Sequence, residues 1–178
     1  HMDHWTVPAV EFTPGAPRGT TMLLADGGRA GAGADASRLL GAQQRVVALD
    51  PFYFGESSLG PRDFLFGLLV ASLGERPLGI EAGQVAASAR WLATRHGAPV
   101  AIVARGPRTS LIALVAAALE PEAISGVEVH DSWRSLREVL TRNISAQQMP
   151  EMFTFGLLEA FDVPQIERLV APRTVSVR

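Results

Sequence analysis

The first candidate for chemistry is the pentapeptide Ala-Arg-Gly-Pro-Arg at residues 104–108, between the apolar run 100–103 and a long apolar stretch that begins at Thr109. This pattern predicts a strand, a sharp turn and a helix. Such a turn exposes a nucleophilic serine in the motif G-x-S-x-G, and the backbone N–H of the next residue stabilises the oxyanion. Here the serine position is Gly106, and Pro107 follows it without an N–H. The segment therefore predicts a turn without the nucleophile and without one oxyanion donor.

Two other serines could supply a nucleophile. Ser110 lies about one turn into the predicted helix, and Ser57 lies in a loop rich in aromatic residues and glycine. A helical backbone aims the Ser110 hydroxyl along the flank of the helix, so a helix-surface role is its alternative. The alternative for Ser57 is a structural role within its loop.

His130 and Asp131 follow the apolar run 124–129. If that run is a strand of a parallel sheet, both residues lie at the edge where such sheets bind ligands. A His beside an Asp could act as a base, or bind a metal with a third ligand. No His pair has metal-ligand spacing, so we predict no metal site. The alternative is that Asp131 or Ser132 caps a helix that begins near Trp133.

A second glycine-rich turn follows the apolar run 20–25, where Gly27, Gly31 and Gly33 precede a predicted helix. Asp50 ends the next apolar run about twenty residues later, which is the layout of a dinucleotide fingerprint. In that motif the glycines let the backbone approach a pyrophosphate and the acid binds a ribose hydroxyl. The alternative is a tight strand-to-helix turn with no ligand.

Arg105 and Arg108 flank the start of the helix that follows Gly106. Helix N-termini favour negative charge because of their unpaired N–H groups and the helix dipole. This pair predicts an anion site, weakened by the missing donor at Pro107, or else two solvated arginines.

Three consecutive aromatic residues form another candidate binding surface: Phe52, Tyr53 and Phe54. Their rings could stack on a sugar. The alternative is that they cover a core or a domain interface.

Composition bounds the remaining chemistry. The 178 residues carry a net charge of −2, which gives no electrostatic reason to expect nucleic acid or an anionic membrane as a partner. There is no Cys and no Lys, which excludes disulfides, thiol nucleophiles, Cys-based metal sites and catalytic lysines. No apolar run reaches the ~20 residues that span a bilayer. His1 and Met2 look like a cloning remnant, and nothing in the sequence indicates a compartment.

Apolar strand-like runs alternate with helical patterns along the chain. We predict strands at 20–25, 45–49, 100–103, 124–129 and 172–177, with a short edge strand within 5–12. We predict helices at 34–42, 62–73, 80–96, 109–119, 133–142, 149–161 and 164–169. Continuous apolar strands that alternate with helices indicate a parallel sheet of about five main strands with helices on both faces. The length fits a single domain over residues 1–178.

Several segments resemble the α/β-hydrolase superfamily. The loop from Asp50 to Ser57 resembles D-x-x-G-x-G-x-S, with Tyr53 in place of a Gly, and Asp26-Gly27-Gly28 occupies the place of the His-Gly-Gly oxyanion loop. The similarity continues through 50–59, 62–66, 75–79, 106–110, 150–153 and 171–173, in the order found in acetyl-xylan-esterase-like proteins. It covers most of the chain and resembles a degenerate domain of longer carbohydrate-esterase-type proteins.

The resemblance implies hydrolysis of acylated carbohydrate through Ser, His and Asp, but the nucleophile aligns with Gly106. The chain stops at Arg178, after what the resemblance makes the penultimate strand, so we expect the final strand and its His to be absent. We therefore expect a non-catalytic domain of a longer protein, with no cofactor. The remainder of that chain, a second copy paired through an exposed sheet edge, or a carbohydrate would be its partner.

Two alternatives remain open at this point. One is an active esterase that uses Ser110 or Ser57 with His130 and Asp131. The other is a nucleotide-binding module at the turn 27–33.

Overall fold

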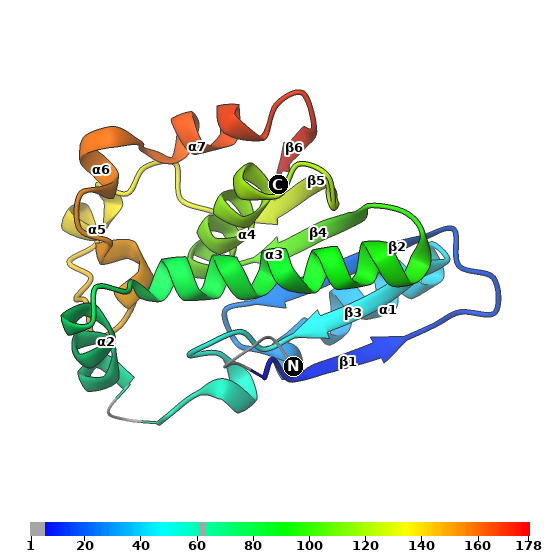
Figure 1. The fold of residues 1–178 in the computed structure, drawn as a ribbon, viewed down its shortest axis with the longest axis horizontal. Helices are drawn as coiled ribbons and strands as arrows, with labels where there is room; N and C mark the ends of the chain where they lie inside the picture. Colours follow the sequence, from blue (N-terminus) through cyan, green and yellow to red (C-terminus); the bar gives the residue numbers. More distant parts are fainter. Residues whose placement is uncertain (1–5, 61–62) are drawn as a thin grey trace.

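The computed structural model describes residues 6–60 and 63–178, which form a sheet of six strands (Figure 1). The strand order is β1-β3-β2-β4-β5-β6, and every neighbouring pair is parallel except β1 with β3. The bounds are β1 Ala9–Phe12, β2 Gly19–Ala25, β3 Gln44–Leu49, β4 Val100–Arg105, β5 Ile124–His130 and β6 Thr174–Val177. The five predicted main strands and the edge strand are therefore confirmed.

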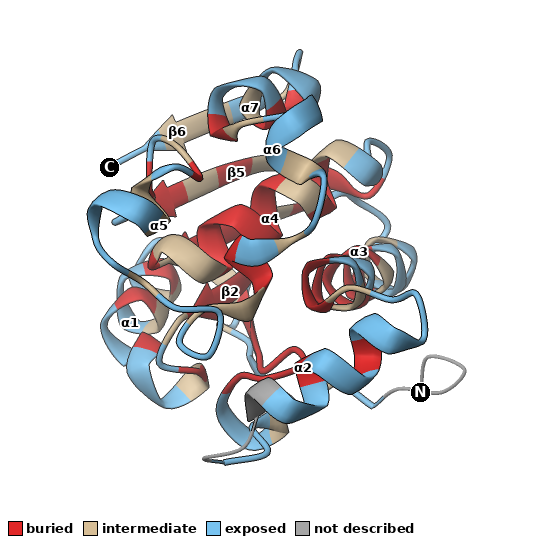
Figure 2. Cartoon of the chain, turned by 90° about the vertical axis from the view of Figure 1, so that its left-hand side faces the viewer, coloured by how far each residue is buried: buried red, intermediate tan, exposed pale blue. Residues whose placement is uncertain are grey.

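Helices cover both faces of the sheet (Figures 1 and 2). On one face, α1 (Gly33–Gly41) packs against Leu23, Ala25 and Val103. On the other face, α3 (Pro77–His96), α4 (Pro107–Leu119) and α7 (Val163–Val170) enclose the larger core. Because successive strand residues point to opposite faces, β2, β3 and β4 each supply both cores, and this explains their continuous apolar runs.

The remaining elements lie beyond the carboxyl ends of the parallel strands (Figure 1). They are the helices α2 (Asp63–Ser72), α5 (Glu138–Thr141) and α6 (Leu157–Ala160), and the short 3₁₀ turns η1 (Arg29–Ala32), η2 (Gly55–Ser57) and η3 (Pro150–Phe153). Within the described residues, no helix combines the length and the apolar character that crossing a bilayer requires.

Two predicted helices are wrong in extent. Of the helix predicted at 133–142, the helix α5 covers only Glu138–Thr141, because the carboxylate of Asp162 binds Leu136 N (2.7 Å) and Ser135 Oγ (2.5 Å) and holds this segment outside a helix. The capping role proposed for Asp131 or Ser132 is wrong for the same reason, since no helix begins at Trp133.

The stretch predicted as one helix at 149–161 is two short elements, η3 and α6. Gly156 separates them with a φ of 79°, a left-handed conformation that ends a helix. Asp162 then caps α7 through a capping box with Gln165.

Candidate functional site

The carboxyl ends of β2, β4 and β5 meet at the turn that leads from β4 into α4. The N–H of Asp26 donates to the carbonyl of Arg105 (2.9 Å), and the N–H of Gly106 donates to the carbonyl of His130 (2.9 Å). Parallel strands end at one edge, so this is the position that the sequence predicted for a nucleophile turn.

Gly106 adopts a φ of 104°, a conformation that favours glycine. A Cβ at this position would lie 2.3 to 2.7 Å from the carboxyl atoms of Asp26. The space into which a nucleophile's side chain would project is therefore filled by the Asp26 carboxylate. A serine fits at residue 106 only if that carboxylate moves.

The same carboxylate binds the N-terminus of α4. Asp26 Oδ1 accepts hydrogen bonds from Thr109 N and Thr109 Oγ1, each at 2.8 Å, and Oδ2 accepts one from Arg108 N at 3.2 Å. Helix N-termini bind anions through such N–H groups. The helix N-terminus at which the sequence predicted an anion site is thus occupied by the carboxylate of Asp26.

Arg108 covers this turn from the side of the larger core. Its Nε forms a close ion pair with Oε1 of Glu151, and its guanidinium lies 4.3 Å from the centroid of the Phe54 ring. Glu151 is fully buried, and so is Glu81 on α3. Asp26, Glu81, Arg108 and Glu151 form what we call the buried acid cluster.

Burial dominates the electrostatics of this cluster. It raises the pKa of Glu81 well above its usual value, and repulsion from Glu151 adds to the shift. It also raises the pKa of Glu151 and of Asp26, although Arg108 and the hydrogen bonds from Thr109 oppose the shift. Within the described part of the chain, neither oxygen of Glu81 has a hydrogen-bond partner. Burial without a hydrogen-bond partner therefore favours the neutral form of Glu81.

The sequence analysis missed Glu81 and Glu151 as members of the site. Glu81 lies on the apolar stripe of its helix with Leu78, Val85 and Ala89, all of which are buried. An acid at a core-facing helical position is the signal that could have found it. Glu151 gave no comparable signal, because it lies in a 3₁₀ turn whose packing depends on distant residues.

The structure separates the alternative catalytic residues. Ser110 Oγ is buried, without a partner in the described residues, on the face of α4 that packs against Trp133 and Met152. The side chain of His130 lies on the other sheet face, where its Nε2 is 2.7 Å from Glu128 Oε1. Asp131 binds Arg105 on that same side (3.1 Å).

Arg105 also binds Asp35 on α1 (2.6 Å), so it points away from Arg108 and the two do not converge on one ligand. Ser57 Oγ donates to the carbonyl of Asp50 (2.9 Å), which is a structural contact within its loop. No serine of the proposed set therefore lies with His130.

Asp50 binds the glycine-rich turn at residues 27–33. Its oxygens accept from Arg29 N (2.8 Å) and Glu56 N (3.1 Å) and form an ion pair with Arg29 Nε (2.8 Å). A Cβ at Gly28 or Gly55 would come within about 3 Å of this carboxylate or its neighbours. These glycines therefore let the turn close on Asp50, and a ribose would have to displace those contacts.

The predicted sugar-stacking surface is wrong, because the side chains of Phe52, Tyr53 and Phe54 are buried in the larger core. The Gly28 N–H of the oxyanion-like loop donates to the carbonyl of Ala25 (2.8 Å). Among the described residues, no group of three His, Cys, Asp or Glu side chains is placed to hold a metal ion.

No family model and no curated protein sequence matches this chain. Solved structures do match it. The α/β hydrolase GrgF from Penicillium sp. sh18 gives a TM-score of 0.60 at 11% identity, over 97% of this chain and 79% of its own. A thermostable carboxyl esterase from Bacillus coagulans gives 0.57 at 15% identity, over 89% of this chain and 55% of the esterase.

Est1E from Butyrivibrio proteoclasticus, solved with ferulic acid, gives a TM-score of 0.52 at 11% identity, over 70% of this chain and 48% of its own. This chain thus spans about half the length of these two esterases. At identities this low, the structural similarity establishes a shared fold alone. That fold is the one expected from the sequence.

The contact between Gly106 and Asp26 predicts the effect of restoring the nucleophile. Gly106→Ser should destabilise the protein by about 2–4 kcal/mol, because it adds overpacking to left-handed strain. In an Asp26→Ala background the destabilisation caused by Gly106→Ser should fall to about 1 kcal/mol, because only the left-handed backbone strain remains. Urea unfolding of the four proteins of this double-mutant cycle measures the difference.

Gly97→Ser is the matched control, because Gly97 has a φ of 71° with open space around its Cβ position. It should cost about 1 kcal/mol in either background. Equal costs for Gly106→Ser with and without Asp26 would show that the carboxylate does not fill that space.

The raised pKa of Glu81 predicts a dependence of stability on pH. A carboxyl group whose pKa is raised on folding binds its proton more tightly in the folded state than in the unfolded state. The free energy of unfolding should therefore fall as the pH rises from about 4.5, the ordinary pKa of the group, through its raised pKa in the folded protein. The slope from one such group is at most about 1.4 kcal/mol per pH unit. Glu81→Gln should flatten this slope in urea unfolding between pH 4 and 9.

Glu75→Gln serves as the control, because Glu75 is an exposed carboxylate just before the same helix. An unchanged slope in Glu81→Gln would contradict the assignment of Glu81 as a neutral acid.

Proposed function

We propose that this chain, which has the α/β-hydrolase fold, is a non-catalytic hydrolase-like domain with a structural, interface or ligand-binding role. The observation that carries the proposal is the Asp26 carboxylate in the space beside Gly106. Ester hydrolysis through this turn needs a hydroxyl that projects there, and the fold instead places the carboxyl group of Asp26 at that point.

The oxyanion donors support the same proposal. Pro107 has no N–H, the N–H groups of Arg108 and Thr109 bind Asp26, and that of Gly28 binds Ala25. At each of these four positions the donor is thus absent or engaged within the chain. Acyl transfer depends strongly on such donors, since removal of one costs about 10²–10³ in rate.

The proposed ligand and partner follow from the resemblance to acetyl-xylan-esterase-like proteins and from the sheet edge. A carbohydrate is the ligand that this resemblance suggests. The strand β6 pairs with β5, and the N–H of Arg178 donates to the carbonyl of Val129 (2.9 Å). By strand alternation, the N–H groups of Val175 and Val177 face away from β5, where the rest of a longer chain or a second copy could pair with them.

The purified chain should release 4-nitrophenol from 4-nitrophenyl acetate no faster than its His130→Ala variant does, because no nucleophile lies in the turn. Stopped spectrophotometric assays at pH 7 and 8 with both proteins measure this rate. Turnover that disappears in Ser110→Ala or Ser57→Ala, with an unchanged melting temperature, would overturn the proposal in favour of an active esterase.

Pairing through β6 predicts a dimer at high concentration. Val177→Pro should shift the light-scattering mass toward the monomer, because it removes an outward-facing N–H from the edge, while Val177→Ala should leave the mass unchanged. A strict monomer for the unsubstituted chain would exclude the second copy as the partner.

A further inference from the structure

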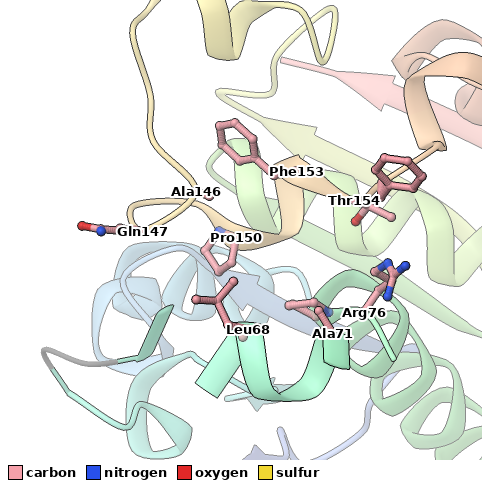
Figure 3. A pocket seen from close by; sticks show the side chains of 11 residues that line it. Leu68, Ala71, Arg76, Ala146, Gln147, Pro150, Phe153 and Thr154 are labelled. Carbon is pink, nitrogen blue, oxygen red and sulfur yellow. The ribbon is translucent and has the colours of Figure 1, made fainter. Parts of the chain in front are cut away.

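A cavity of about 440 Å³ lies between α2, the start of α3 and the segment 146–155 (Figure 3). We call it the α2–η3 pocket. Its volume lies within the ~300–1,000 Å³ of small-molecule sites. None of the four residues of the buried acid cluster lines it. An inference about this pocket therefore goes beyond the proposed function and does not depend on it.

The walls of the pocket are mostly apolar. Leu68 and Ala71 of α2 lie opposite Pro150 and Phe153 in Figure 3. Leu68 is 64% exposed and Phe155 is 89% exposed, although both line the cavity. Every described side chain of α2 except that of Ser72 is apolar or glycine, yet Figure 2 shows the helix largely exposed. Apolar surface left open around a cavity marks a place where a ligand or partner covers it.

One end of the pocket carries positive charge. Arg76 lines it beside Thr154 (Figure 3), and α3 begins with the next residue, so the positive end of a 20-residue helix adds to the guanidinium. Among the described side chains (residues 6–60 and 65–178), Arg76 forms no ion pair, and its Nη1 donates to the carbonyl of Glu75 (2.8 Å). The remaining N–H groups of the guanidinium are available for a carboxylate, which arginine binds in a bidentate manner.

Apolar walls and one cationic end are complementary to one class of molecule. We propose that the α2–η3 pocket binds an amphiphilic carboxylate, a medium-chain fatty acid anion, with its hydrocarbon chain against Leu68, Pro150 and Phe153 and its carboxylate on Arg76. Thr154 does not compete for the anion, because its hydroxyl donates to the carbonyl of Glu151 (2.9 Å). The acid nearest to Arg76 in sequence, Glu75, is exposed and absent from the lining.

The test is a titration of the ¹⁵N-labelled chain with octanoate, followed by amide chemical shifts. Octanoate should saturate shifts in α2, at residues 76–78 and at 146–155. Octanamide, which has the same chain without the charge, and acetate, which has the charge without the chain, should each bind at least about tenfold more weakly. Arg76→Gln should weaken octanoate about tenfold and leave octanamide unchanged.

Ala71→Phe should block both ligands by filling the pocket. Arg95→Gln is the control for lost charge, because Arg95 lies near the opposite end of α3, where its guanidinium stacks on Trp91. Variants are compared only where their melting temperatures match that of the unsubstituted chain, and Arg76→Gln tests the charged end of the pocket without altering its apolar walls.

Equal affinity for octanoate and octanamide, or undiminished octanoate binding in Arg76→Gln, would overturn the proposal. A third result would also overturn it: octanoate does not bind, the unsubstituted chain is a dimer, and Ala71→Phe is a monomer. A second copy of the chain would then occupy the pocket. Release of 4-nitrophenol from 4-nitrophenyl octanoate would instead contradict the non-catalytic function, without affecting the measured affinity for octanoate.

Discussion

The hydrogen bonds between the Asp26 carboxylate and the first turn of α4 are the contact on which this site depends. They join the end of β2 to the start of the most deeply buried helix and satisfy N–H groups that would otherwise lack partners. The carboxylate reaches them only because residue 106 has no side chain. A side chain at residue 106 and the observed position of the Asp26 carboxylate are therefore mutually exclusive, and this chain has the carboxylate.

Placing an acid at this point affects its surroundings. Arg108 lies on the same turn and forms an ion pair with the buried Glu151, while Glu81 contributes a second fully buried carboxyl group. Buried ion pairs add little net stability, but loss of one partner is costly because the other charge remains unpaired. The cluster thus connects η3, α3 and α4 at the edge where the parallel strands end.

Sheet geometry explains why Ser110 and His130, two residues of the alternative esterase hypothesis, do not meet. His130 and Arg105 point toward α1, whereas Ser110 packs on the opposite face with Trp133. Adjacent strand residues point to opposite faces, so a shift of one position decides which helix layer a side chain joins. A sequence motif at the end of a strand indicates the edge of the sheet at which its residues lie. The face of the sheet to which each side chain points follows only from the register of the strand.

The sequence by itself determined the alternation of apolar strands with helices, the turn at Gly106-Pro107 and hence the class of fold, because these depend on local backbone preference and on periodicity. It did not determine that Glu81 and Glu151 converge on Arg108, that Asp162 holds the segment after β5 out of a helix, or that the aromatic residues 52–54 are buried. Those features depend on contacts between residues tens of positions apart. Only the packed tertiary structure, in which burial sets the cost of each charge, decides them.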